Sequence, residues 1–303
     1  MSDTDNGIDS SAESSADSDT EAADQGYVSL VIAYRNHDLV REVLRQLDGQ
    51  SLPPRKVLIA DNGGTLSAAD LTEMPLADRT ELVSLPENPG YGAAVNVARD
   101  RLGHDALLVL THDAVFGPGL AERLLDTLKQ GAPTAGCAAP LLRFADNRER
   151  VFSAGGLVTA GGRASHLNEP RAAKPYPVAW VDGAIAMYTA AALEAIDWIA
   201  EEYFLYFEDV DTGWRLSQHG FESLIVPDEI SYQQPGAHPM YLGIRNMVLF
   251  ARKSGIPRAK NRAAVIRRVA RESLGRLRRG KPSGIGEAIR GWRDGNRGLS
   301  GKP

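Results

Sequence analysis

The sequence holds a single cysteine, Cys137, among its 303 residues. An internal disulfide is therefore excluded, and the chain suits a reducing compartment. No uncharged apolar run approaches the ~18 residues that a membrane-spanning helix needs. The N-terminus also lacks the basic and then apolar series of a secretory signal. We therefore expect a soluble protein, or at most a membrane-associated one, that acts in the cytoplasm or at the inner face of the cell membrane.

Two common nucleotide-binding motifs are missing. A dinucleotide-binding fold would show Gly-x-Gly-x-x-Gly in the first strand-to-helix turn, but that turn reads Tyr34-Arg35-Asn36-His37. Gly-Lys-Ser and Gly-Lys-Thr are absent as well. The first strand is not followed by the Gly-rich loop with Arg and Lys that a sugar-phosphate nucleotidyltransferase would show. Hydride transfer, ATP hydrolysis and nucleotidyl transfer are therefore poor interpretations.

Charge is distributed unevenly along the chain. Residues 1–26 carry eight acids and no Lys or Arg, with Ser and Ala between them, so we expect a disordered acidic tail. From Ala251 onward sixteen of the 34 Lys and Arg residues stand against three acids. We therefore expect residues 254–303 to form a basic helical extension, and the net charge of −5 hides a polarised molecule.

Apolar periodicity predicts strands that alternate with helices over the first 130 residues. The expected strands are 27–33, 56–60, 81–85 and 106–110, and the expected helices are 38–47, 90–102 and 120–129. This alternation indicates an α/β fold whose mainly parallel sheet is covered on both faces. Further on, 155–177 is expected to be irregular, and helices are expected at 210–219, 240–253 and 258–279.

Polar residues follow each predicted strand of the first half. They are Tyr34-Arg35-Asn36, Asp61-Asn62, Asn88-Pro89-Gly90-Tyr91-Gly92 and Thr111-His112-Asp113. In a parallel sheet the strand ends meet at one edge, where ligands bind. Each group alone is better explained as a turn or a helix cap, but their joint placement favours a ligand site.

Three carboxylates, Glu208, Asp209 and Asp211, come directly after the aromatic run Phe204-Leu205-Tyr206-Phe207. Carboxylates held against apolar walls serve as general bases or cation ligands. The alternative for Glu208 and Asp209 is capping of the following helix. Asp211 has the spacing of a helical ion pair with Arg215, which favours a structural role for it.

Several blocks in order give the chain a family resemblance. They are Val28–Arg35, Ala60–Gly64, Glu87–Asn96, Leu108–Asp113, Trp180–Ala184, Phe204–Asp211 and Arg245-Asn246. Together they resemble the family-two inverting glycosyltransferases, and in particular the rhamnosyltransferase and galactofuranosyltransferase-like branch. The resemblance implies a GT-A domain over 27–253, with a nucleotide-binding half (27–118) and an acceptor half (119–253).

The resemblance also implies a reaction: a sugar moves from a UDP- or dTDP-sugar to a hydroxyl of a glycan or polyprenyl-linked acceptor. Asp209, beside Glu208, matches the general base, and Asp61 matches the contact to the nucleobase. The wider set of implied donor-binding residues is Ala33, Tyr34, Arg35, Asp61, Asn88, Gly92 and Asn96. The implied sugar- and acceptor-binding residues are Trp180, Asp182, Gly183 and Arg245, although Trp180 fits the core equally well.

A divalent cation, Mg²⁺ or Mn²⁺, is implied at Asp113, which matches the last acid of a DxD-like motif. The first acid is replaced by Thr111. His112 and His238 are candidate additional ligands. The single carboxylate leaves open the alternative of a catalytically weakened relative that binds carbohydrate or acts as a scaffold.

The basic extension has two interpretations: solvated helical charge, or a helix that lies on an anionic membrane surface and so meets a lipid-linked acceptor. Nucleic acid is not expected as a partner, because the region has few base-stacking aromatics.

Overall fold

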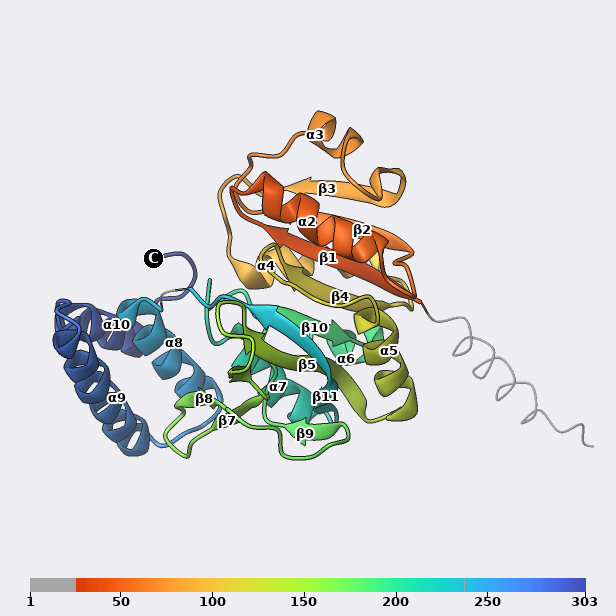
Figure 1. Cartoon of the computed structure of the whole chain (residues 1–303). Helices are drawn as coiled ribbons and strands as arrows, with labels where there is room; N and C mark the ends of the chain where they lie inside the picture. Colours follow the sequence, from red (N-terminus) through yellow and green to blue (C-terminus); the bar gives the residue numbers. More distant parts are fainter. Residues whose placement is uncertain (1–25, 237) are drawn as a thin grey trace, which may run out of the picture.

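The computed structural model describes residues 26–236 and 238–303 (Figure 1). The predicted acidic tail, residues 1–26, lies outside the described residues apart from Gly26. Within the described part, a large mixed sheet carries helices on both faces, and three further helices extend from one side. The predicted α/β class is confirmed.

The central sheet has nine strands in the order β3-β2-β1-β4-β10-β5-β11-β9, with β6 beside β5. Their bounds are β1 (Tyr27–Ala33), β2 (Lys56–Asp61), β3 (Thr80–Ser84), β4 (Ala106–Thr111), β5 (Ala135–Phe144), β6 (Val151–Ser153), β9 (Tyr176–Val178), β10 (Ile185–Tyr188) and β11 (Glu222–Gln233). A separate hairpin pairs β7 (Gly156–Val158) with β8 (Ala164–His166).

The strand order reverses at β1, which pairs in parallel with β2 on one side and β4 on the other. Ala33 lies opposite Asp61 and Ile32 opposite Thr111 in these registers. Chain connections therefore diverge at the carboxyl ends of β1 and β4. In open α/β sheets this divergence produces the crevice in which ligands bind. The polar residues after β4 thus lie beside the position where the first strand ends.

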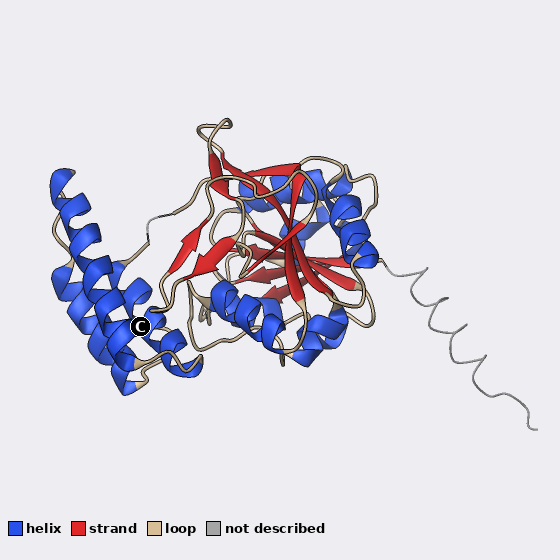
Figure 2. Cartoon of the chain, turned by 90° about the horizontal axis from the view of Figure 1, so that it is seen from below, coloured by secondary structure: helices blue, strands red, loops and turns tan. Residues whose placement is uncertain are grey.

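Helices cover both faces of the sheet (Figure 2). The bounds are α2 (His37–Asp48), α3 (Ala68–Thr72), α4 (Tyr91–Asn96), α5 (Leu120–Gln130), α6 (Ala190–Ala195) and α7 (Glu208–Gln218). Helix α2 starts at the cap Asn36, whose side chain accepts from Leu39 N at 3.2 Å, and it buries Val40, Leu44 and Leu47 at helical spacing. Helices α2 and α5 share one apolar cluster, and α4 and α6 share the cluster on the opposite face.

Two predictions for local structure are wrong. The stretch 155–177 was expected to be irregular, but it contains β7, β8 and the start of β9. The expected helix 90–102 is interrupted: α4 ends at Asn96 and a short 3₁₀ turn, Arg99–Arg101, follows. The Asn96 side chain is bonded to residues of the 199–201 segment, a contact between distant parts of the chain that the local pattern does not reveal.

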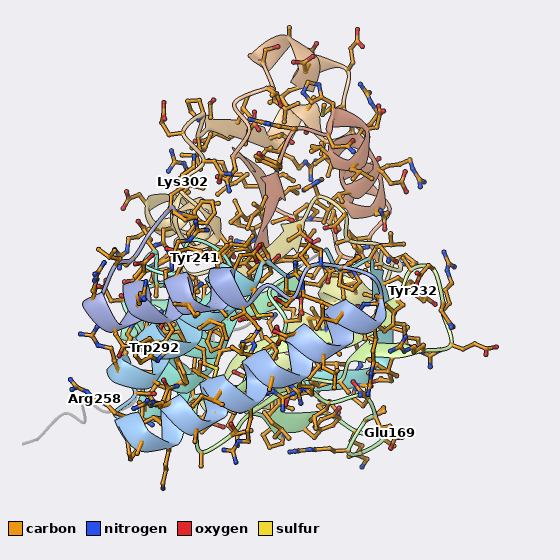
Figure 3. The ribbon with its side chains drawn as sticks, turned by 90° about the vertical axis from the view of Figure 1, so that its left-hand side faces the viewer. Glu169, Tyr232, Tyr241, Arg258, Trp292 and Lys302 are labelled. Carbon is orange, nitrogen blue, oxygen red and sulfur yellow. The ribbon has the colours of Figure 1, made fainter. Side chains whose placement is uncertain are left out.

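Three helices make up the C-terminal end of the chain (Figure 3): α8 (Met240–Lys253), and then α9 (Arg258–Arg278) and α10 (Ile285–Arg297) of the basic extension. Helix α10, which the sequence pattern did not reveal, approaches α8 closely because two glycines face it. A Cβ on Gly291 would lie 2.4 Å from Tyr241 O, and one on Gly295 would lie 2.8 Å from Arg245 O. No helix of the described chain is long and apolar enough to cross a bilayer. The domain boundary at residue 253 stays a prediction.

Candidate active site

A cavity of about 400 Å³ opens at the carboxyl edge of the sheet. Its walls come from the end of β4 at Thr111, the β7–β8 hairpin, the segment 180–184, the aromatic run 205–207, the start of α7, and α9. Trp180, Asp182, Glu208, Asp209 and His238 all line it. The structure thus brings together residues that are up to 58 positions apart in the sequence. Gly183, which the sequence analysis also predicted as a site residue, lines this cavity as well.

The two adjacent acids occupy the first turn of α7, which begins at Glu208. Glu208 is buried, and its Oε2 has no hydrogen-bond partner within the described residues. Asp209 is half-buried, and its Oδ1 accepts from Val210 N at 2.7 Å. The positive end of the helix favours negative charge here. The N-cap position is Phe207, and no side chain makes a cap hydrogen bond, so the two acids lie inside the first turn and are not its cap.

Burial raises the pKa of both carboxyls. That of Asp209 rises to about 7; the charge of Asp182 adds to the rise, and backbone amides at the helix start oppose it. The pKa of Glu208 is raised well above its ordinary range, mainly by burial and then by the charge of Asp209. Both groups therefore hold their protons to a higher pH than exposed carboxyls do. Raised carboxyl pKa values in a cavity are typical of residues that exchange protons with a ligand.

The aromatic run before α7 has an unusual backbone. Phe204, Tyr206 and Phe207 have φ values of 65°, 69° and 78°, in the left-handed region that costs bulky residues of the order of 1–2 kcal/mol each. The Asn246 side chain holds this turn, because its Nδ2 donates to the carbonyls of Tyr203, Leu205 and Tyr206 at 3.0, 2.9 and 2.8 Å. Asn246 is thus a positioning residue for α7 and its acids.

Arg245 does not line the cavity, which corrects its predicted contact with the sugar. Its side chain is 1 % exposed, and its guanidinium donates to Asn246 Oδ1 at 2.9 Å, Tyr203 O at 2.9 Å and Gly301 O at 2.8 Å. These three partner residues do not line the cavity either. Arg245 therefore supports Asn246 and links the aromatic turn to the C-terminal end.

Helix α4 packs against the opposite side of the same turn. Tyr91 N donates to Phe204 O at 2.8 Å, and a Cβ on Gly90 would lie 2.4 Å from that oxygen. A Cβ on Gly92 would lie 2.5 Å from Ala200 O, and Asn96 exchanges hydrogen bonds with Ile199. Gly92 and Asn96 are therefore occupied with packing α4 on the 199–204 segment, which accounts for them without a donor contact.

The predicted nucleotide-binding residues lie at the ends of β1, β2 and β3, outside the cavity lining. Asp61 is fully buried, and its carboxylate accepts from Gly63, Thr65 and Leu66 N at 2.9, 2.6 and 2.8 Å. It therefore organises the loop after β2, as its turn interpretation expected. Three other predicted residues lie at strand ends: Ala33 ends β1, Tyr34 is exposed, and Asn88 has a φ of 47°.

Arg35 is also exposed at this edge, with its guanidinium 5.0 Å from the centroid of the Tyr34 ring. Its own φ is 53°. A cation and an aromatic face are thus presented together beside the end of β1. A nucleobase contact by any of these residues stays a prediction.

The predicted cation ligands are spread over two places. Asp113 is half-buried just after β4, and Thr111 Oγ1 beside it is buried without a partner in the described chain. The His112 ring is directed at the backbone, with Nδ1 3.2 Å from Ile32 O. His238 stacks on Tyr206 at 4.2 Å, and burial lowers its pKa. Within residues 26–236 and 238–303 no three His, Cys, Asp or Glu side chains gather as a ready metal cage.

His166, which the sequence analysis missed, lies in the cavity wall. Its ring lies 4.8 Å from both the Phe152 and Trp180 rings, its Nδ1 is 3.0 Å from Ser153 Oγ, and its Nε2 is 3.9 Å from Asp182. Trp180 is 3 % exposed and donates to Leu157 O at 3.3 Å, so it is also a core residue. The alternation of apolar and polar residues within 151–166 was the available signal for strands, but the glycines of this stretch obscured it.

Two further wall residues, Arg268 and Glu272, come from α9. Arg268 donates to Glu272 Oε1 at 2.7 Å and to Gly243 O at 3.0 Å. The basic C-terminal region therefore contributes to the cavity itself, and no local sequence signal distinguishes Arg268 from its neighbouring arginines.

Comparison with known proteins bears directly on this geometry. The sequence model described as "Glycosyltransferase like family 2" matches residues 25–275. The chain belongs to glycosyltransferase family 2. It is a transferase, and the family resemblance in the sequence is confirmed.

A relative from Mycobacterium tuberculosis, N-acetylglucosaminyl-diphospho-decaprenol L-rhamnosyltransferase, is 30% identical over 205 residues. The alignment covers 57% of this chain and 64% of the relative, so the match spans less than two thirds of that protein.

Two solved structures share the fold of this glycosyltransferase. GalNAc-T7 with UDP, GalNAc and Mn²⁺ has a TM-score of 0.60 at 10% identity, over 75% of this chain and 48% of that one. A mannosyltransferase from Pyrobaculum calidifontis in complex with GDP-Man and Mn²⁺ has a TM-score of 0.51 at 18% identity, over 75% and 63%. These likenesses establish the GT-A fold, with the C-terminal helices added to it.

The first testable consequence concerns pH. A general base works only when deprotonated, so kcat/KM is expected to fall about tenfold per pH unit below pH 7 and to level off above it. An ordinary aspartate would place this inflection near pH 4. A pH–rate profile decides between the two, and an inflection near pH 4 would contradict the assignment of Asp209.

Stability gives an independent reading of the same group. Because the folded state raises the pKa of Asp209, the folded protein holds this proton more tightly than the unfolded chain. Its stabilising contribution is complete below pH ~4 and is lost as pH rises to 7. His166 and His238 have lowered pKa values and act in the opposite direction. Asp209→Asn removes the Asp209 contribution together with the part of the Glu208 rise that the Asp209 charge causes, so by denaturant titration the variant is expected to lose less stability over this interval.

A second prediction concerns the aromatic turn. Asn246→Leu removes the donors to three carbonyls, so the free energy of unfolding is expected to fall by about 1–3 kcal/mol. Activity at temperatures where the variant is folded is expected to fall as well, because α7 loses its anchor. Asn296→Ala, which removes only an exposed bond to Trp292 O, is the control and is expected to change stability by less than about 0.5 kcal/mol. Equal effects of the two substitutions would refute the anchoring role.

Proposed function

We propose that the enzyme transfers a sugar with inversion from a nucleotide-diphosphate-sugar to a hydroxyl of a glycan or lipid-linked acceptor, with Asp209 as general base. The observation that carries this proposal is the cavity in which Asp209, with its raised pKa, stands beside the buried carboxyl of Glu208. A carboxylate with a pKa near 7 combines basicity with availability at neutral pH, which is what proton abstraction requires.

The proposed step is a single displacement. The acceptor oxygen bonds to the anomeric carbon as its proton passes to Asp209, and the bond from that carbon to the diphosphate breaks. Asp182 supports this role because its charge contributes to the raised pKa of Asp209. Burial favours the protonated form of Glu208, and in that form its carboxyl is able to donate a hydrogen bond to a sugar hydroxyl. Trp180 and Gly183 are proposed to shape the sugar subsite.

The donor is proposed to be a UDP- or dTDP-sugar, with its nucleotide at the ends of β1, β2 and β3. The strand-order reversal at β1 supports this position. The name of the mycobacterial relative supports a rhamnose donor and an acceptor carried on a polyprenyl diphosphate. The buried free Cys137 fits the proposed location at the cytoplasmic face.

A divalent cation, Mg²⁺ or Mn²⁺, fits the residues present as a partner shared with the donor. Mg²⁺ is commonly held by one or two carboxylates together with substrate phosphates, and Asp113 with the unpartnered hydroxyl of Thr111 offers such a half-shell. When bound, the cation would neutralise the leaving diphosphate. The other half of the shell would come from the donor, so the lack of a ready cage among the described residues is consistent with this proposal.

One alternative retains a specific observation. The replacement of the first motif acid by Thr111 leaves one carboxylate, Asp113, at the proposed cation site. This favours a weakened relative that binds carbohydrate as a scaffold subunit. The two functions differ in whether Asp209 matters for turnover.

Asp209→Asn separates them. With the donor chosen by a thermal-shift screen of nucleotide-sugars with and without Mn²⁺, turnover is expected to fall by about 10²- to 10⁴-fold while donor affinity stays unchanged. The exposed Glu169→Gln is the matched control and is expected to keep full activity. Transfer that survives Asp209→Asn would sink the base assignment.

We also propose that α9 lies on an anionic membrane surface. Six exposed apolar residues follow one another at spacings of three or four along the helix: Ala259, Ala263, Ile266, Ala270, Leu274 and Leu277. The exposed arginines Arg267, Arg271 and Arg278 flank this stripe. Such a pattern is typical of helices that bury an apolar face at the level of lipid headgroups.

Vesicle sedimentation tests this surface. Binding to phosphatidylglycerol vesicles is expected to exceed binding to phosphatidylcholine vesicles, and Ile266→Ser or Leu277→Ser is expected to weaken it by about tenfold each, since burial of such a side chain contributes ~1.5–3 kcal/mol. Val115→Ser, at an exposed apolar residue after β4, is the control. Equal binding by all variants would remove the proposal.

A further inference from the structure

A second depression, about 590 Å³, adjoins the active-site cavity. His238 and Glu272 line both spaces, so the two are continuous across these side chains. The new space, here called the basic groove, is lined further by Met240, Gly275, Arg271, Arg276, Arg279 and Lys281. None of these last six was predicted to line a ligand site, and Arg271 was named above only for the outer surface of α9.

Positive charge in the basic groove is largely uncompensated. Arg276 lies 3.8 Å from Glu287, and Glu272 is paired with Arg268 at 2.7 Å. Across the described residues, no carboxylate lies within ion-pair distance of Arg271, Arg279 or Lys281. Like charges gathered without counter-charges produce a positive potential that attracts an anion.

The shape of the groove suits a compact anion. Gly275 leaves its floor open: the nearest atoms to a Cβ at this position would be the guanidinium nitrogens of Arg279, at 3.7 and 3.8 Å. The Arg279 head group therefore lies over the glycine. Guanidinium groups offer paired N–H donors that match phosphate oxygens, which is why arginine predominates where phosphates are recognised.

The position of the groove identifies which phosphate is involved. The donor diphosphate is proposed to lie at the end of β4, near Asp113, whereas the groove lies beyond His238 on the α9 side of the cavity. An acceptor of the type named in the mycobacterial relative carries one sugar on a lipid diphosphate. With its hydroxyl at Asp209, that diphosphate must lie one sugar away, beside the cavity. The exposed side chains of Leu274 and Leu277 in the α9 stripe are then available to contact the lipid chain.

We propose that the basic groove binds the diphosphate of a lipid-linked acceptor, with Arg271 and Arg279 as its main ligands. This rests on the proposed function, because it assumes that the acceptor sugar occupies the cavity at Asp209. The groove then measures the acceptor: it selects a saccharide whose reacting hydroxyl and whose diphosphate are separated by a single ring.

The test uses the full chain and geranyl diphosphate, a short water-soluble probe with the same anion. Calorimetric titration is done in the Asp209→Asn background without donor, so no turnover is required. Arg271→Gln combined with Arg279→Gln is expected to weaken geranyl diphosphate binding by at least tenfold. The matched control, Arg262→Gln combined with Arg293→Gln, removes the same charge from exposed positions outside the groove and is expected to change binding by less than about twofold.

Three further arms separate the sources of an anion effect. Geranyl monophosphate is expected to bind more weakly than the diphosphate, and saturating UDP is expected to leave geranyl diphosphate bound. Binding to phosphatidylglycerol vesicles is expected to fall in both double variants, and more in the groove variant because Arg271 also flanks the α9 stripe, so a membrane effect differs from loss of geranyl diphosphate, which offers no surface. Melting temperatures of both are expected to match the parent, since all four side chains are exposed.

Three results would each overturn the groove assignment: equal losses of geranyl diphosphate affinity in both double variants, displacement of geranyl diphosphate by UDP, or no binding of geranyl diphosphate at all. These outcomes are independent of the base. If the groove fails while Asp209→Asn abolishes transfer, the proposed reaction stands and the acceptor is held elsewhere. If transfer survives Asp209→Asn, the proposed reaction fails whatever the groove binds.

Discussion

The site depends on one constraint, the fixing of the turn 203–207 in a backbone conformation that its residues disfavour. Three bulky residues of this turn have positive φ. Carbonyl groups of the turn accept hydrogen bonds from Asn246 and Arg245 on one side and from Tyr91 N on the other. Strain of this kind persists only where the surroundings over-determine it. The turn delivers the first residues of α7 into the cavity, so the anchoring of the turn and the placement of the acids are one structural problem.

Burial of the acids is the second consequence of that arrangement. A helix start normally lowers carboxylate pKa values through its free amides, yet here burial outweighs the amides and raises the pKa of both Glu208 and Asp209. The free energy that this costs is supplied by packing elsewhere, because Phe207 and Val210 of the same segment are buried against α8 and its neighbours. A carboxyl with a pKa near 7 is therefore a product of the apolar packing around α7.

The sequence was sufficient wherever a local pattern decides the structure. Short β-branched runs placed β1, β2 and β4, and the aromatic run followed by acids located Glu208 and Asp209. It failed where a residue's role depends on a distant partner. Gly92 and Asn96 sit in a motif that suggests ligand contact, but their partners at 199–201 are about a hundred residues away. Likewise, His166 lies in the cavity wall because β8 pairs with β7 as a hairpin, and the glycines around these strands obscured that hairpin in the sequence.

The C-terminal helices contribute to the active-site cavity, although their charge alone sets them apart from the rest of the chain. Helix α10 is held to α8 by backbone contact at Gly291 and Gly295, and α8 carries Asn246, so the stability of the extension is transmitted to the turn that positions α7. Helix α9 in turn places Arg268 in the cavity wall and turns a separate apolar stripe outward. One helix thus has a face for the active site and a face for the exterior. A rigid element of this kind fixes the distance between the reacting hydroxyl and whatever surface presents the acceptor, which a flexible basic tail would not do.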